Sequence, residues 1–228
     1  LALLTGILIS FVSFMRLAKY LIENKPILIW SFFFGLIIAS IIYVAKQIKV
    51  WRPVTFIMLI IGAFLAYYIT TLPSLGSSTN AYFLFIAGAI AICAMILPGI
   101  SGSFILVILG AYKTLSDAFH DFDVKKITLF ASGALVGLLS FSHILKWLFK
   151  NYENTTLALL TGFIFGSLNK IWPWKKILKT RINSEGEEVT LLDQSILPSS
   201  YQGDNQIILA IIFIVVGFAT ILILEGLG

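Results

Sequence analysis

The segment Leu97-Pro98-Gly99-Ile100-Ser101-Gly102-Ser103 separates two strongly apolar runs, at about 81–97 and 104–116. One continuous helix over residues 81–116 would be about 54 Å long, too long for a single crossing of about 30 Å of hydrocarbon, whereas each run alone is short. Proline lacks the backbone donor and glycine allows left-handed geometry, so the segment predicts a helix break. The simplest arrangement is a re-entrant hairpin, in which two half-helices meet deep in a membrane.

The composition predicts a membrane protein. Of 228 residues, 59% are hydrophobic and only 12% are charged, and the mean hydropathy is +0.98. A soluble domain contains about 25% charged residues and does not expose this much apolar surface. We therefore expect an all-α polytopic membrane protein. The single cysteine, Cys93, excludes a disulfide framework and a cysteine-based metal site, and the net charge of +5 lacks the basic-aromatic stripe of a nucleic-acid binder.

The apolar runs place the remaining helices within one transmembrane domain, residues 1–228. They lie at about 1–22, 26–45, 53–72, 127–149, 155–172 and 206–226. Residues 173–205 are polar, with a Lys/Arg cluster followed by acidic residues, and are expected to form an extramembrane loop or a small hairpin. The sequence shows no signal-peptide pattern and begins inside an apolar run.

The chain also aligns with itself. Residues 6–40 match residues 133–167 without gaps at an offset of 127, and ten positions are identical, where two apolar helices share roughly 3 or 4 by chance. The identical pairs are Gly6/Gly133, Leu8/Leu135, Ser13/Ser140, Phe14/Phe141, Lys19/Lys146, Leu21/Leu148, Asn24/Asn151, Gly35/Gly162, Ile37/Ile164 and Ser40/Ser167. The match predicts an internal duplication, with convergent small-residue packing as the alternative. Internal repeats are typical of secondary transporters, so the duplication favours transport.

The spacing of the repeat carries two further expectations. Three full crossings and one hairpin lie between Gly6 and Gly133, an odd number, so the two copies are expected to be inverted. If residues 81–116 cross once as a broken helix, the copies are parallel. The broken segment lies about 30 residues before the second copy, so its partner motif is expected upstream of Leu1, and the first repeat is expected to lack its N-terminal part.

The broken segment is a candidate anion site. A half-helix that starts near Ser103 would direct free N–H groups into a cavity, Gly99 and Gly102 would let the backbone approach a ligand, and two serines would add hydroxyl donors. We therefore assign phosphate binding to the whole segment from Pro98 through Ile100 to Ser103. The alternative is a structural Pro-Gly kink with serines as caps.

An anion in lipid needs a countercharge. The repeat alignment superposes Arg16 on His143 and Lys19 on Lys146, so two paired helices each carry a basic residue with a lysine one turn later. Ionisable groups in membrane spans are functional candidates, although long side chains near helix ends also reach the headgroups. We assign Arg16 and His143 to phosphate binding. His143 also suits proton transfer near neutral pH, or a packing role between helices.

A longer stretch of the sequence resembles the signature of a known family. Residues 87–104, followed by Leu109-Gly110-Ala111-Tyr112, resemble the second signature of a bacterial family once classed as a domain of unknown function and now regarded as polyprenyl-phosphate (undecaprenyl-phosphate) translocases. The resemblance covers nearly the whole chain, and members typically carry a related Pro-Gly-x-Ser-Gly-Gly motif in their first half. Many members have Glu where this chain has Lys113, so no carboxylate role transfers to it; a lysine there suits an anion.

The resemblance implies a lipid transporter, or flippase. It would return undecaprenyl phosphate from the outer to the inner leaflet of the bacterial cytoplasmic (inner) membrane, where the carrier is reused for cell-envelope synthesis. The expected partners are membrane lipid and polyprenyl phosphate. No metal or cofactor is expected, while coupling to a proton or another ion, and the oligomeric state, stay open.

Other functions compete with transport. Gly99-Ile100-Ser101-Gly102 matches the Gly-x-Ser-Gly of rhomboid intramembrane proteases, but a four-residue match is weak and His143 lacks the expected glycine-rich helix. A lipid phosphatase needs arginines and histidines clustered with its nucleophile, and the sparse arginines and two histidines of this chain do not form that set. The sequence also contains no His-Glu-x-x-His motif that would indicate a zinc enzyme. A non-transporting envelope assembly factor is a further alternative.

Overall fold

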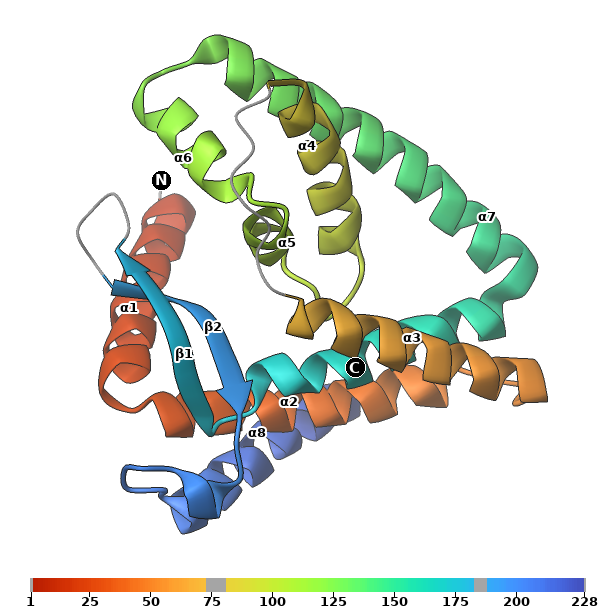
Figure 1. Ribbon diagram of the computed structural model, residues 1–228. Coiled ribbons are helices and arrows are strands. Elements are labelled where there is room, and N and C mark those ends of the chain that lie inside the picture. The colour runs from red at the N-terminus through yellow and green to blue at the C-terminus, as the bar shows by residue number, and fades with distance from the viewer. Residues whose placement is uncertain (1, 73–80, 183–187, 228) are drawn as a thin grey trace. The chain divides into compact units, whose positions relative to one another are not determined.

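The computed structural model describes residues 2–72, 81–182 and 188–227, and these residues are mainly helical (Figure 1). The elements are α1 (Ala2–Asn24), α2 (Pro26–Lys46), α3 (Pro53–Thr71), α4 (Ala81–Ile96), α5 (Gly102–Ile108), α6 (Tyr112–His120), α7 (Val124–Ile171), β1 (Lys175–Ile182), β2 (Glu188–Ser195), a 3-10 turn (Pro198–Ser200) and α8 (Ile207–Leu227). In this described part, α2, α3, α7 and α8 are long and apolar enough to cross a membrane, and the bent pair α5 and α6 would add a fifth crossing if it forms one span. The expected all-α polytopic membrane class is confirmed.

The predicted apolar run at 104–116 is wrong as a single helix. Instead, α5 ends at Ile108 and α6 begins at Tyr112, with the two axes bent by 108°. Gly110 has a positive φ of 70°, and the amide of Ala111 donates to the carbonyl of Leu106 at 2.9 Å. This is a glycine-ended helix stop, in which left-handed backbone satisfies the last carbonyls. Local capping therefore outweighs the apolar character of the run.

The two aligned segments break at equivalent positions. Lys25 separates α1 from α2, and Tyr152 interrupts α7 with non-helical backbone angles of φ −140° and ψ 46°. The residue before each break is an asparagine whose side chain donates to the carbonyl four residues earlier, Asn24 to Tyr20 and Asn151 to Trp147, both at 2.8 Å. The same side-chain bond at the same register supports the proposed duplication.

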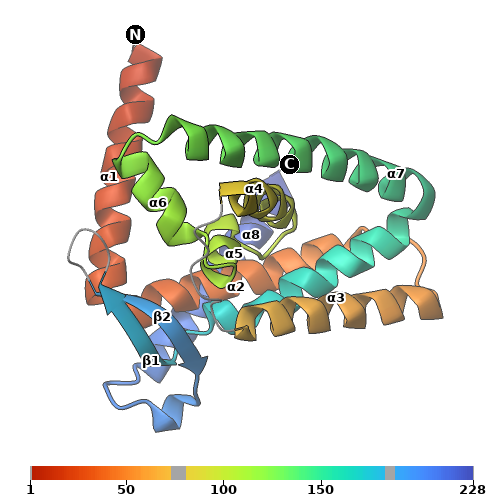
Figure 2. The same ribbon diagram turned by 45° about the horizontal axis from the view of Figure 1, so that its top comes forward.

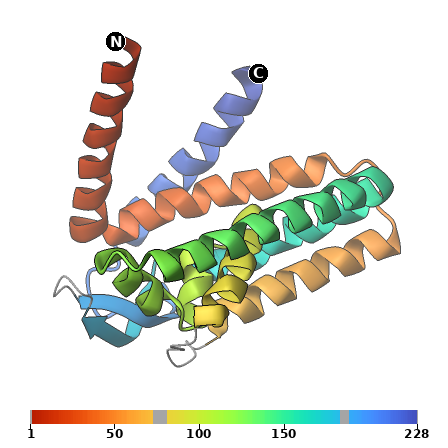
Figure 3. The same cartoon turned by 90° about the horizontal axis from the view of Figure 1, so that it is seen from above.

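By its internal contacts the chain divides into two compact units, residues 1–40 with 170–228, and residues 41–169. Within the first unit α2 crosses α8, and within the second unit α3 runs beside the second part of α7 (Figure 3). Both crossings are made by glycines that leave no room for a Cβ atom. A Cβ at Gly35 would overlap the backbone of Ile214, and a Cβ at Gly162 would overlap the backbone of Leu59.

The two crossings share one contact register. Gly217 lies against Phe32 and Leu36 in the first unit, and Gly62 lies against Leu159 and Phe163 in the second. The offset of 127 relates every α2 residue of these contacts to its α7 counterpart, and an offset of 155 relates α3 to α8. The helix that follows each aligned segment, α3 or α8, therefore packs on the second helix of the other segment; we call this the exchange of third helices. Close backbone packing at small residues is how helices associate in lipid.

Residues 173–205 contain a small β-hairpin, as one of the two expected forms, with β1 antiparallel to β2. Asp193 on β2 binds Lys170 at 2.8 Å and Lys175 at 3.1 Å, and the ammonium of Lys175 lies 5.6 Å from the ring centre of Trp30. Trp174 is buried with Ile27 and Ala210 in the cluster beneath the hairpin. The Lys170 ion pair therefore joins the hairpin to the end of α7, and the buried Trp174 joins it to the starts of α2 and α8.

Burial and charge act against each other in this cluster. Desolvation of the Asp193 carboxyl opposes ionisation, but hydrogen bonds and charges from Lys170 and Lys175 outweigh it, so the pKa of Asp193 lies below its usual value. Lys175 is more buried and has Lys170 as a second cation nearby, so burial lowers its pKa despite the pull of Asp193. Asp193 in its ionised form therefore stabilises this cluster.

We expect the reciprocal glycines to tolerate no larger side chain. Gly35→Leu and Gly162→Leu should each lower the thermal unfolding temperature of the full-length protein in detergent, because the backbone opposite cannot move aside; overpacking of this kind costs about 1–3 kcal/mol. Gly6→Ala is the control, since a Cβ there meets nothing within 4 Å. Equal stability of all three variants would contradict the tight crossings.

Asp193→Asn should weaken the hairpin at neutral pH by about 1.5–3 kcal/mol, the usual worth of hydrogen bonds to a charged group. Since the folded pKa of Asp193 is lowered, its contribution is present above the unfolded value near 4 and disappears as the pH falls through the folded value. Thermal unfolding at a series of pH values measures this. On acidification, the difference in unfolding temperature between the wild type and Asp193→Asn should disappear. A difference that stays constant with pH would contradict the ion pairs.

Candidate functional site

The predicted helix break is present. Helix α4 ends at Ile96 and α5 begins at Gly102, so the intervening residues are not helical. Gly99 has a φ of +90°, a conformation that side chains rarely adopt, and it turns the chain back on itself. After the turn, Gly102 lies against Met95 and the carbonyl of Ala91, which places α5 beside α4 (Figure 2). The two glycines thus have separate roles, one in the turn and one in the close approach.

The break is packed from one side. Ile100 is buried in a cluster that includes Ala94, Ile105 and Phe163. A Cβ at Gly99 would overlap the side chain of Ser167, which comes from the second part of α7. The non-helical backbone is therefore covered by protein on this side, as irregular backbone at membrane depth requires.

The opposite side of the break is polar and accessible. Ser101 and Ser103 are both exposed, and their hydroxyl oxygens lie 2.8 Å apart, within hydrogen-bond distance. Because α5 contains only seven residues, its dipole is weaker than that of the longer half-helix expected from the sequence. The two hydroxyls, together with the loop amides, are the groups that this side offers to an anion.

The other assigned residues lie on separate elements. Lys113 is exposed in the first turn of α6, beyond the bend at Gly110. His143 is exposed on α7, and Arg16 is exposed on α1 in the first unit. The structure brings the six residues Pro98–Ser103 together, while convergence of the three basic residues on that segment stays a prediction.

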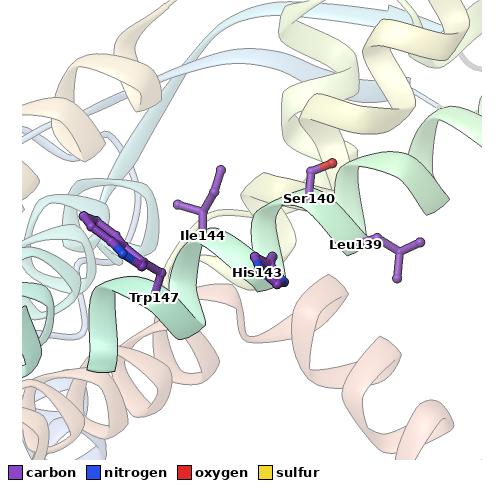
Figure 4. Close-up of a pocket in the computed structure, with 5 residues that line it drawn as sticks. All are labelled: Leu139, Ser140, His143, Ile144 and Trp147. Carbon is purple, nitrogen blue, oxygen red and sulfur yellow. The ribbon is translucent and has the colours of Figure 1, made fainter. Parts of the chain in front are cut away.

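His143 belongs to a distinct feature of α7. With Leu139, Ser140, Ile144 and Trp147 it lines an open hollow of about 740 Å³ along one stretch of the helix (Figure 4). Reasoning from the sequence did not select Ser140 or Trp147. Ser140 is one of the identical positions of the repeat, which was the available signal.

The hollow continues the face of α7 that packs on α4. A Cβ at Gly133 would overlap the backbone of Phe85, and one at Gly137 would meet Ala89, so the two helices run in the same direction. Ser140 and Ile144 follow Gly133 and Gly137 at helical spacing. The hollow therefore begins beyond the α4 contacts, toward the end of α4 from which the broken segment continues.

Two observations on the described residues concern metal and serine chemistry. Within residues 2–72, 81–182 and 188–227, no three His, Cys, Asp or Glu side chains gather as metal ligands. The hydroxyl of Ser101 contacts another serine, whereas a serine protease needs a base within reach of its nucleophile.

Comparison with known proteins shows the family to which the chain belongs. A family model described as VCA0040-like, undecaprenyl phosphate translocase-like, matches residues 1–189. The chain belongs to this translocase-like family. The matched range of the translocase-like chain includes the break, α7 and both copies of the repeat.

Two curated relatives agree with the family. This translocase-like chain is 43% identical over 224 residues to a polyprenyl-phosphate transporter of Vibrio cholerae, covering 96% of the chain and 73% of the relative. It is 32% identical over 189 residues to a polyprenyl-phosphate transporter of Staphylococcus aureus, covering 75% of the chain and 67% of the relative. No solved structure matches the chain.

Gly99→Ala should destabilise the turn in two separable ways. The new Cβ overlaps Ser167, and alanine pays roughly 1–2 kcal/mol for the left-handed backbone. The second change Ser167→Gly removes the overlap but not the backbone cost, so thermal unfolding of Gly99→Ala/Ser167→Gly should recover only part of the loss, measured against Ser167→Gly alone. Full recovery would mean that the positive φ is not required.

Proposed function

We propose that this protein translocates polyprenyl phosphate, specifically undecaprenyl phosphate, across the bacterial cytoplasmic membrane and so returns the carrier lipid for envelope synthesis. The observation that carries the proposal is the 43% identity, over almost the whole chain, to a curated polyprenyl-phosphate transporter. The several apolar helices supply the membrane body that such a substrate needs. Direction and energy coupling are not part of the proposal, although His143 offers a group able to carry a proton.

The proposed phosphate site is the accessible side of the break. Ser101 and Ser103 would donate hydroxyl hydrogen bonds to phosphate oxygens, and amides of the loop that turns at Gly99 would add backbone donors. Pro98 prevents the helix from continuing, and Ile100 anchors the loop from behind. Arg16, His143 and Lys113 would supply positive charge as the headgroup moves.

The proposed mechanism depends on the internal repeat and on α4–α5 as a re-entrant hairpin. Matching helix breaks and the shared glycine register support the repeat, and the reversal at Gly99 supports the hairpin. In inverted repeats, a site between the copies can open alternately to the two leaflets. The polyprenyl tail would stay in lipid while only the phosphate crosses through protein.

The transporter names of the relatives argue for transport over catalysis. An intramembrane serine protease remains the competing reading of Ser101, and the two functions differ in one measurement. Ser101→Ala would abolish proteolysis, because the nucleophile is lost. It should lower phosphate binding only in part, because loop amides and Ser103 remain.

The test is leaflet exchange in liposomes that contain the full-length protein and a labelled undecaprenyl phosphate. Wild type should accelerate exchange over protein-free liposomes, and Ser101→Ala/Ser103→Ala should slow it by roughly tenfold or more, since two hydrogen bonds of about 1 kcal/mol each are lost. Undecaprenol, which lacks the phosphate, is the substrate control and should not respond to the protein.

Two results would contradict the proposal. Wild-type protein that leaves exchange unchanged would remove the transport function. Rapid exchange with the double serine variant equal to wild type would retain transport and remove the assigned site. Ser142→Ala, a serine on α7 bonded to the carbonyl of Leu139, serves as the matched control.

A further inference from the structure

The two aligned helices present the same exposed pattern of side chains. On α7, Ser140, His143 and Trp147 are spaced by three and then four residues, which places them along one helix face. All three are exposed, Trp147 to 55%. They line the hollow of about 740 Å³ with apolar walls from Leu139 and Ile144.

The first copy repeats the pattern on α1. Ser13, Arg16 and Tyr20 have the same spacing and occupy the positions equivalent to the α7 residues. They are also exposed, Tyr20 to 60%. Only the serine is identical in the two copies. The pattern that recurs is a hydroxyl, a basic group and an aromatic ring. Two sites that bind the same type of ligand would keep the same residue classes at these positions.

The helix break in each aligned segment supports the equivalence of these positions. Asn24 and Asn151 make the same bond to the carbonyls of Tyr20 and Trp147, so each aromatic residue sits one turn before the helix break. The alignment of the two stripes therefore does not depend on sequence identity alone.

The chemistry of the stripes fits one kind of ligand. A serine hydroxyl and a basic group within one helix turn offer two hydrogen-bond donors to a monophosphate. The aromatic ring one turn further on, and in α7 the side chains of Leu139 and Ile144, offer an apolar wall to the chain attached to that phosphate. Free phosphate has no apolar part to contact the wall, and a neutral lipid has no charge to pair with the basic group. A lipid monophosphate has both.

We infer that α1 and the first part of α7 each bind the headgroup and first isoprene units of a polyprenyl monophosphate, through Ser13-Arg16-Tyr20 and Ser140-His143-Trp147. This inference deepens the proposed function and rests on it for the identity of the lipid. The protein thus has two equivalent lipid-docking stripes besides the broken segment. They differ in the basic group, a guanidinium on α1 and an imidazole on α7.

Native mass spectrometry of the full-length protein, released from detergent with farnesyl monophosphate as the probe, tests the stripes by counting bound lipids. Removing one stripe with His143→Ala/Trp147→Ala should lower the number of bound probes by one, and adding Arg16→Ala/Tyr20→Ala should lower it by one more. Each stripe variant should weaken the affected site by at least roughly tenfold. Ser142→Ala should leave the count unchanged, and farnesol should not bind.

His143→Lys is the conservative variant and should keep its site, since it keeps a basic donor. If the double variants do not fold, Ser140→Ala and Ser13→Ala should still weaken binding singly. An unchanged count and affinity in all stripe variants overturns the inference and assigns the residues to anchoring at the membrane surface.

The outcomes separate this inference from the proposed function. If the wild type exchanges lipid and the stripe variants bind the probe as well as the wild type does, the docking stripes are rejected and the transport function is kept. Absence of wild-type exchange, with probe binding that still falls as the stripes are removed, removes transport and retains two lipid-docking sites.

Discussion

Contact between helix backbones at glycine holds each unit of this protein together. Lipid chains are as apolar as leucine side chains, so helices in a membrane gain little from burying apolar surface and depend on close packing instead. Gly35 and Gly217 provide that contact in one unit, and Gly62 and Gly162 provide it in the other. The functional side chains can therefore occupy other helix faces, where packing does not restrict them.

The broken segment depends on the same packing. Backbone without helical hydrogen bonds is tolerated at membrane depth only where protein or water covers it. The cover comes from Ser167, which lies one turn beyond Gly162 and next to Gly166, and both glycines pack on α3. The crossing of α3 with α7 thus positions the surface on which Gly99 turns. The candidate site therefore rests on this helix crossing, while its two serines stay exposed.

Most helices followed from apolar length, and the break followed from Pro98 and its glycines, because both signals are local. The stop at Gly110 was missed because its apolar neighbours hide the capping signal. The exchange of third helices was also missed, since the longer polar segment 173–205 changes the repeat offset and conceals the match. The sequence could not place Arg16 and His143 relative to the broken segment, because that depends on how helices distant in the sequence approach each other.

The exchange of third helices has a consequence during synthesis. Gly35 on α2 is translated long before Ile214 of α8, whose backbone covers it. At about 5–20 residues per second, the glycine face of α2 waits roughly 10–40 s for this partner. During that time the nascent chain must stay beside the insertion machinery, or be shielded by lipid, until α8 arrives.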